Sequence, residues 1–217
     1  ESAAPENILF GHSTHEISAN LVVGSSVTSA KPLNANRRVA VKGVALHGEG
    51  FILSSELAEA MLKEASECSR VVKPYRNGND ITGRSKDRFV IDFFGWSEVE
   101  ARENFPVQYQ HVLLNVKPER DANRREVRKK NWWLFGETVP ALRQALANLA
   151  RYIVTVRTAK HRTFVFLDSA ILPESRLVAV ASDDAFLLGV LSSNFHSVWA
   201  LGTGAKLEDR PNYNNSE

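Results

Sequence analysis

The chain has one cysteine, one methionine and no long hydrophobic run among its 217 residues. Because Cys68 is alone, an internal disulfide framework and a cysteine-based zinc site are excluded, and a reducing, cytoplasmic compartment is expected. No segment approaches the roughly 20 apolar residues that a membrane-spanning helix requires, so no membrane partner is expected. The chain starts at Glu1 rather than at a methionine and shows no signal peptide, which favours excision or processing from a longer protein.

Motifs for catalysis are also scarce. His12 and His15 are followed by Glu16, but no third metal ligand is indicated, so an exposed loop is favoured. The residue types of a nucleophilic triad occur near the C-terminus, at Ser192 or Ser193, His196, and Asp183 or Asp184. No Gly-x-Ser-x-Gly turn surrounds either serine, so helix-end packing is the favoured interpretation there. No glycine-rich phosphate-binding fingerprint occurs in the chain.

The charge of the chain is distributed unevenly. Apolar residues make up 43% and charged residues 24%, as in an ordinary soluble globular protein, and the net charge is only +2. Residues 117–162 nevertheless carry 12 Lys and Arg against 4 Asp and Glu, a local balance of +8. The rest of the chain carries 15 against 21, a balance of −6. Such an asymmetry is typical of a face that binds a polyanion.

Two β-branched and aromatic strands, Tyr152–Arg157 and Thr163–Leu167, are predicted to form a ribbon. Its crest, Arg157–Arg162, holds three cations and a histidine, which suits entry into a nucleic-acid groove, with a solvated hairpin turn as the alternative. Arg and Lys can address guanine, Asn can address adenine, and Ser or His can serve either base. We therefore expect base reading at the crest and after the last long helix, by Arg157, Lys160, His161, Arg162, Ser192, Ser193, Asn194 and His196. Helix termination is the alternative for Ser192–His196.

A second basic feature is an expected helix, Pro118–Trp133, whose Arg120, Arg124 and Arg128 would line one side. Flexible cationic side chains in such a row suit phosphates, which carry no sequence information. The expected phosphate contacts are Arg120, Arg124, Arg125, Arg128, Lys129, Arg143 and Arg151. Trp132 and Trp133 are expected to pack as core anchors.

The remaining pattern predicts an α+β fold with mixed and antiparallel sheets and flanking helices. Further strands are expected at Leu21–Val23, Val39–Leu46, Phe51–Leu53, Arg88–Gly95 and Arg176–Ala181. Helices are expected at Ser55–Ser66, from Ser97 to about Phe105, and at Val107–Val116, Thr138–Leu149 and Asp184–Leu191. Pro74–Gly83 is expected to be a loop and Leu207–Glu217 to be frayed. Asp92, inside an apolar strand, needs a partner if it is buried.

An ordered series of motifs resembles a known family. The motifs are Lys117-Pro-Glu-Arg120, Asn123-Arg-Arg-Glu126, Trp132-Trp-Leu-Phe-Gly-Glu137, Arg151-Tyr-Ile-Val-Thr155, Ala159-Lys-His-Arg162, Phe164-Val-Phe-Leu-Asp168, Leu172-Pro-x-Ser-Arg176, Gly189-Val-Leu-Ser-Ser193 and Phe195-His-x-x-Trp-Ala200. The series resembles the target recognition domain of the large single-chain adenine-N6 DNA methyltransferases, including fused restriction–modification enzymes of type IIG/IIL. The resemblance implies one domain over 1–217, with a looser N-terminal lobe at 1–86 and a core with a basic DNA-facing surface at 87–210.

The family's methylating half lies upstream and carries a glycine-rich S-adenosylmethionine loop and an Asn/Asp-Pro-Pro-Tyr/Phe motif. This sequence has neither, since Arg210-Pro-Asn-Tyr213 departs from the second motif. The resemblance therefore implies a module that recognises a double-stranded DNA sequence, binds no cofactor itself, and has the methyltransferase domain of its parent chain as a partner. The alternatives are a small hydrolase with a Ser/His/Asp pocket and a basic scaffold that docks an acidic protein.

Overall fold

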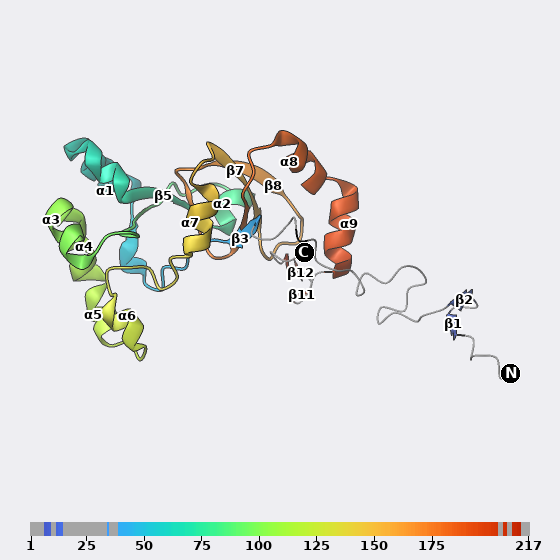
Figure 1. Cartoon of the computed structure of the whole chain (residues 1–217), viewed down its shortest axis with the longest axis horizontal. Helices are drawn as coiled ribbons and strands as arrows, with labels where there is room; N and C mark the ends of the chain where they lie inside the picture. Colours follow the sequence, from blue (N-terminus) through green and yellow to red (C-terminus); the bar gives the residue numbers. More distant parts are fainter. Residues whose placement is uncertain are drawn as a thin grey trace.

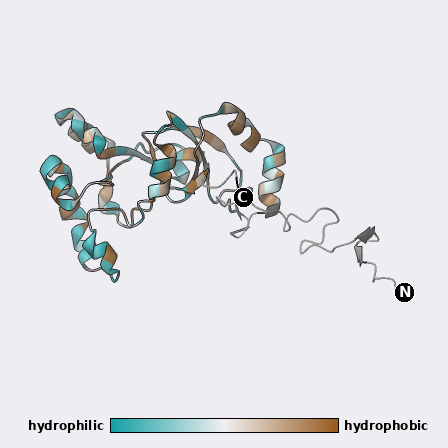
Figure 2. Ribbon diagram, in the orientation of Figure 1, coloured by the Kyte–Doolittle hydropathy of each residue, from teal (hydrophilic) through white to brown (hydrophobic). Residues whose placement is uncertain are grey.

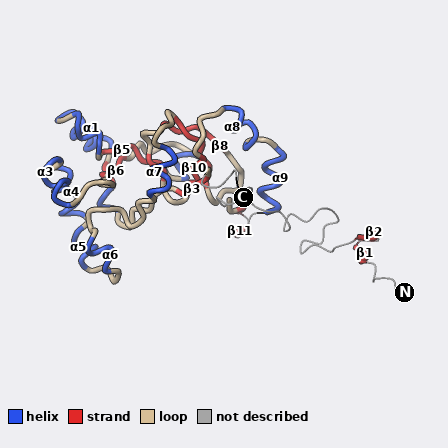
Figure 3. The backbone as a smooth tube through the Cα atoms, in the orientation of Figure 1, coloured by secondary structure: helices blue, strands red, loops and turns tan. Residues whose placement is uncertain are grey.

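The computed structural model describes residues 7–9, 12–14, 34, 39–203, 206–207 and 210–213. The strand expected at Leu21–Val23, together with His15 and Glu16, lies outside the described residues. Figures 1 and 3 show a helical lobe at one end, strands in the centre, and two further helices at the other side of the strands. A short antiparallel hairpin of β1 (Asn7–Leu9) and β2 (His12–Thr14) precedes these parts.

The first four-stranded sheet contains the predicted ribbon. Its order is β3 (Ala40–Lys42), β10 (Leu177–Val180), β7 (Arg151–Val156) and β8 (Phe164–Asp168), and every pairing is antiparallel. β7 and β8 pair from Arg151 opposite Asp168 to Thr155 opposite Phe164. The alternating β-branched and aromatic residues thus form the expected hairpin, shifted by one residue at each boundary.

The second sheet has the order β4 (Ile52–Leu53), β6 (Phe89–Ile91), β5 (Val72–Arg76) and β9 (Leu172–Pro173), with β9 parallel to β5. The loop expected at Pro74–Gly83 is therefore wrong, because this stretch completes β5 and forms α2 (Gly78–Thr82). The N–H of Tyr75 bonds to the carbonyl of Arg88, directly before β6, so the nitrogen of Pro74, which carries no hydrogen, faces the other edge of β5. There β9 pairs only with Tyr75 and Arg76, and proline is tolerated.

Capping residues begin several helices where the sequence predicts them. Ser54 caps α1 (Ser55–Glu64), and Ser97 with Glu100 forms a capping box at α3 (Glu98–Asn104). Pro106 is the first residue of α4 (Pro106–Asn115). The other helical elements are η3 (Glu49–Phe51), η4 (Ser66–Arg70), α7 (Pro140–Leu146), α8 (Ala185–Leu191) and α9 (Asn194–Thr203).

The long helix expected at Pro118–Trp133 is wrong. The chain instead forms α5 (Lys117–Asp121) and α6 (Glu126–Lys130), separated by a turn. In that turn the side-chain oxygen of Asn123 accepts a hydrogen bond from the backbone N–H of Arg125 at 3.0 Å. A local side-chain bond of this kind competes with helical backbone bonding, and it ends the row of arginines.

Two clusters of buried side chains hold the parts together. The larger cluster contains one face of β7, at Tyr152 and Val154, and extends through both sheets into the helical lobe, where Trp132 is buried as expected. The smaller cluster contains the other face of β7, at Ile153, together with Leu191 of α8 and Ala200 of α9. Figure 2 shows hydrophobic residues concentrated on the central strands and on α8. Both sheets contain strands from before and after residue 87.

Candidate nucleic-acid interface

The ribbon tip, which we define as residues 157–163 between β7 and β8, is held by the C-terminal segment. The N–H of Tyr213 bonds to the carbonyl of Arg157 at 2.7 Å, and Thr158 forms a β-bridge with Asn212. Tyr213 is buried and packs its ring 5.6 Å from that of Phe164. The prediction of a frayed end is therefore wrong at residues 210–213, where β12 (Arg210–Pro211), paired with β11 (Lys206–Leu207), leads into these contacts.

Arg162 is directed into the tip. Its guanidinium donates to the carbonyl of Val156, to the hydroxyl of Thr155 at 3.3 Å and to the carbonyl of Pro211 at 3.3 Å. It also lies 4.9 Å from the ring centre of Tyr213. The expectation that Arg162 reads a base is thus corrected, because its donors bond to the chain itself and fasten the tip to the C-terminal segment.

The exposed residues of the tip are Arg157, Lys160, His161 and Thr163. Lys160 and His161 line a pocket of about 260 Å³ whose other wall contains Ser197 and Leu201 of α9. The pocket therefore joins the ribbon tip to α9, the helix that begins at Asn194 in the second segment expected to read bases.

Residues Ser192–His196 span the junction of α8 and α9. Some of them are exposed, and others form hydrogen bonds within the chain. Ser192 and Asn194 are exposed. The hydroxyl of Ser193 accepts a hydrogen bond from the backbone N–H of His196 at 3.2 Å, so this serine caps α9. The His196 ring lies 3.1 Å from the hydroxyl of Tyr213, and burial, followed by the charge of Arg162, lowers the pKa of His196.

Ser193 and His196 thus each have a hydrogen-bond partner within the chain, and their role in base reading stays a prediction. These contacts also leave the triad unassembled, since the carboxylate of Asp184 caps α8 by accepting from the N–H of Phe186 at 2.8 Å. No group of three or more His, Cys, Asp or Glu within the described part of the chain is arranged to hold a metal ion. Nothing in this region supports the hydrolase alternative.

Arg120, expected to contact phosphate, is a core residue with 1% of its surface exposed. One terminal nitrogen donates to the carbonyls of Leu46 and Leu134 at 3.0 and 3.3 Å, and the guanidinium lies 5.7 Å from the ring centre of Phe51. The other two guanidinium nitrogens have no partner among the described residues. Burial lowers the pKa of Arg120, with a smaller effect from Arg128. The prediction of a phosphate contact at Arg120 is wrong, because the side chain is sealed from solvent.

The side chains of Arg143 and Arg151 also bond to other groups of the chain. Arg143 forms an ion pair of 2.5 Å with Asp92, which is 5% exposed, so the expected partner of Asp92 is found. Because the exposed fraction of the Arg143 side chain is only 19%, the expected phosphate contact at Arg143 is corrected as well. Arg151 is exposed, donates to the carbonyl of Asp183 at 3.1 Å and stacks 3.8 Å from the ring centre of Phe166.

The other expected phosphate contacts lie in and beside α6. Arg124 and Arg125 are exposed, whereas Arg128 and Lys129 are half-buried, and Lys129 forms an ion pair of 3.1 Å with Glu126. Figure 1 shows α5 and α6 in the helical lobe, away from β12, which adjoins the ribbon tip. The two basic features that are close in sequence are therefore carried by different parts of the molecule.

Sequence reasoning missed two features beside the tip, α2 and the buried Tyr213. The signal for α2 was Asn77 followed three residues later by Asp80, whose side chains form a capping box. No comparable signal marks Tyr213, because its burial depends on Phe164 and His196 from other elements.

The fold holds the exposed polar tip beside α9, an arrangement expected of a recognition domain. The chain matches the family model described as "MmeI, target recognition domain" over residues 19–216, and it belongs to this family. The α+β fold class and the family resemblance predicted from the sequence are thereby confirmed. A comparison with curated proteins gives no match.

Among solved structures, the chain is similar to the type IIL restriction–modification enzyme MmeI, determined in complex with DNA. The TM-score is 0.67 at 15% sequence identity, and the match covers 94% of this chain. It covers only 27% of the MmeI chain, so this chain spans about a quarter of that enzyme's length. This likeness supports the fold. In the described part of the chain, no helix is long and apolar enough to cross a membrane.

Proposed function

We propose that this chain is the DNA sequence-recognition module of a restriction–modification enzyme that methylates adenine. Family membership supports this proposal, and the observation that carries it is the joining of the exposed ribbon tip to α9 around one pocket. Two segments that present different hydrogen-bonding groups are thereby fixed relative to each other, which sequence readout requires.

In this proposal the exposed groups of the site divide the work of recognition. Arg157 and Lys160 donate to the acceptors of guanine in the major groove, and the amide of Asn194 pairs with adenine. His161 and Ser192 supply further polar contacts at the same edge. Phosphates are held by the exposed cations Arg124 and Arg125 and by Arg128 and Lys129 at α6. The internally bonded residues Arg162, Ser193 and His196 keep the site rigid.

The methylating chemistry is assigned to a partner domain in the longer protein, because neither the S-adenosylmethionine loop nor the catalytic motif occurs in this sequence. We expect the isolated chain to bind no S-adenosylmethionine and to methylate no DNA. Calorimetry with the cofactor tests this expectation, and tight binding to residues 1–217 would contradict it. A soluble, cytoplasmic location belongs to the same proposal.

The decisive experiment measures the binding of duplex DNA over a series of salt concentrations. The chain should bind a randomised duplex pool with an affinity that falls steeply with salt, and repeated selection should enrich one short sequence. Equal binding to all sequences would show a basic scaffold without sequence recognition. Binding to acidic proteins in preference to DNA would support the docking alternative.

A further inference from the structure

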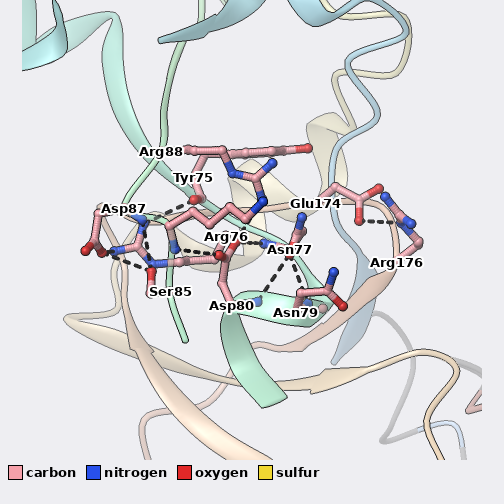
Figure 4. A network of polar contacts seen from close by, with 12 residues as sticks. Tyr75, Arg76, Asn77, Asn79, Asp80, Ser85, Asp87, Arg88, Glu174 and Arg176 are labelled. Atoms are coloured by element: carbon pink, nitrogen blue, oxygen red, sulfur yellow. Dashed lines mark hydrogen bonds and ion pairs between the residues drawn. The ribbon is translucent and has the colours of Figure 1, made fainter. Parts of the chain in front are cut away.

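The segment between β5 and β6, residues 77–88, is fixed by a buried carboxylate. The exposed fraction of the Asp80 side chain is only 1%. One carboxylate oxygen accepts from the N–H of Asn77 at 2.8 Å and from Arg88 at 3.1 Å, and the other accepts from the N–H of Lys86 at 3.0 Å. Figure 4 shows Asp80 in α2, below Asn77 and Arg88. A single side chain therefore ties both ends of the segment together.

A second carboxylate fixes the end of the segment. Asp87 accepts from Arg76 at 2.8 Å and from the hydroxyl of Ser85 at 2.9 Å, and its own carbonyl accepts from Ser55 at 2.9 Å. Its φ of 45° lies in the left-handed region, which these bonds hold in place. The segment is thus pre-organised by polar contacts, as Figure 4 shows.

This network leaves two cations unused. Residues 76–88 contain four cations and two acids, and both acids are paired, Asp80 with Arg88 and Asp87 with Arg76. Arg84 and Lys86 are exposed, and neither forms an ion pair within the part of the chain that the structure describes. Residues 76–88 therefore have a local charge of +2, and the two unpaired cations, Arg84 and Lys86, stand on a rigid backbone.

The α2 part of the segment lies beside the end of β7 that leads into the ribbon tip, on the face of the first sheet that α8 and α9 leave free. A Cβ added to Gly78 would lie 3.1 Å from a methyl group of Val156, the last residue of β7 before the tip. Val156 packs against the larger buried cluster, whereas α8 and α9 cover the smaller cluster on the opposite face. Because the N–H of Glu174 bonds to Arg76 and the N–H of Arg157 bonds to Arg176, the loop before β10 connects the segment to the tip.

We propose that Arg84 and Lys86 bind phosphates of the DNA whose bases the tip reads. This inference rests on the proposed function and extends the interface across the tip to the face opposite α9. The contact is independent of sequence, because a phosphate is the same at every base pair. Because the backbone of residues 77–88 is already fixed, less entropy is lost when the two cations become ordered on the duplex.

The test uses the full-length protein that carries this chain and a duplex that contains its preferred site. The double variant R84Q/K86Q removes one Arg and one Lys without altering the Asp80 and Asp87 pairs. The slope of log affinity against log salt should become shallower by roughly 2, at about 0.9 for each phosphate that is no longer neutralised. The preferred sequence should not change, because base contacts are untouched.

A matched control is K63Q/R102Q, which removes the same two charges from exposed positions on α1 and α3 in the helical lobe. The control should keep the salt slope of the unmodified protein. An unchanged slope in R84Q/K86Q would overturn the inference while leaving the proposed function intact, and so would equal changes in both variants. If the unmodified protein shows no salt-dependent duplex binding, the proposed function and the inference both fail. Loss of binding to an acidic protein, with DNA binding retained, would also overturn the inference.

Discussion

The ribbon tip and the α5–α6 stretch look alike in the sequence but differ in the structure. Each is a short run of cations with few acids, and each contains an arginine that bonds to backbone carbonyls, Arg162 at the tip and Arg120 in α5. Arg162 bonds to the strand before the tip and to the C-terminal segment, so it stabilises the surface that its neighbours occupy. Arg120 is sealed in the core, with two guanidinium nitrogens unpartnered among the described residues.

This difference shows that a basic stretch in a sequence can serve folding or recognition. An arginine whose N–H groups donate to backbone carbonyls has few donors left for a ligand, whereas an exposed cation beside it keeps all of its donors. Burying a charge without a carboxylate is also costly, so the contacts of Arg120 must be essential to the packing of the helical lobe. The difference between the two stretches can be tested by removing one side chain at a time.

The largest effect is expected from Arg120→Ala. The substitution removes the side chain that packs on Phe51 and leaves the carbonyls of Leu46 and Leu134 without their donor. We expect the free energy of unfolding to fall by about 4 kcal/mol in urea denaturation, as for other buried residues whose partners are left unsatisfied. Arg124→Ala, on an exposed side chain of the same stretch, should change it by less than about 0.5 kcal/mol. Equal stability of the two variants would show that Arg120 is not a core residue.

Asp92→Ala should have the next largest effect. It leaves the guanidinium of Arg143, which is mostly buried, without its carboxylate partner. We expect a loss of about 3 kcal/mol, at the lower end of the range for a buried pair that loses one partner. Asp92→Ala, Arg143→Ala and the double variant form a cycle that isolates the coupling between the two side chains. A coupling free energy close to zero would show that each residue acts through separate contacts.

At the tip, single substitutions should change specificity instead of stability. In the full-length protein, Lys160→Ala and Asn194→Ala should each relax the preference at one base pair by about 1–3 kcal/mol. Sequencing of the selected or methylated sites measures this change. Arg124→Gln is the contrasting variant, because removal of a cation that holds a phosphate weakens binding to all sequences alike. If Asn194→Ala left every position of the site unchanged, the junction of α8 and α9 would be removed from the base-reading surface.

Around α6, charge removal should alter the salt dependence of binding only. Replacement of Arg124, Arg125, Arg128 or Lys129 by Gln should each make the salt slope shallower by roughly 1, with the preferred sequence unchanged. Arg120→Met, which keeps much of the side-chain length, should leave the slope as it is, because Arg120 is buried. A change of preferred sequence in an α6 variant would assign that residue to base reading.

Local signals in the sequence predicted local structure well. The alternation of residues in β7 and β8 and the capping box at Ser97 each depend on neighbouring positions, and both were found. The prediction of one long helix at Pro118–Trp133 was wrong because a hydrogen bond to the side chain of Asn123 outweighed the helical pattern of the arginines around it. The loop predicted at Pro74–Gly83 was wrong because β6 and β9, which come from other parts of the chain, supply the strand partners of β5.

The site was predictable in position but not in the role of each side chain. The ribbon tip and the α8–α9 junction were both identified from residue types, and the His196 ring of that junction lies 3.1 Å from the hydroxyl of Tyr213 beside the tip. The carbonyls that bond Arg120 come from residues 74 and 14 positions away, so its burial follows from tertiary packing. The same is true of Arg162 and Pro211, which are 49 positions apart. Which cations are left for a ligand is decided by such contacts, and a pattern in the sequence does not report them.

The smallest expected effect is a pH dependence that originates at the tip. Burial, and then the nearby charge of Arg162, lower the pKa of His196 below its usual 6.5, while the Tyr213 hydroxyl and the Phe164 ring face the same imidazole. The unfolded chain therefore takes up a proton near pH 6.5 that the folded chain does not. Stability from this group is present above that pH and is lost as the pH falls toward the lower folded pKa.

The measurement compares the unfolding free energy of the unmodified protein with that of His196→Gln, from about pH 7.5 to about pH 5. The substitution removes ring contacts at every pH, which adds a constant offset. His111, whose pKa is also lowered by burial, is present in both proteins and cancels in the difference. The advantage of the unmodified protein should shrink as the pH falls through 6.5. An advantage that stays constant, or that grows on acidification, would mean that the charged imidazole is accepted beside Arg162, and His196 would then be available to donate to a ligand.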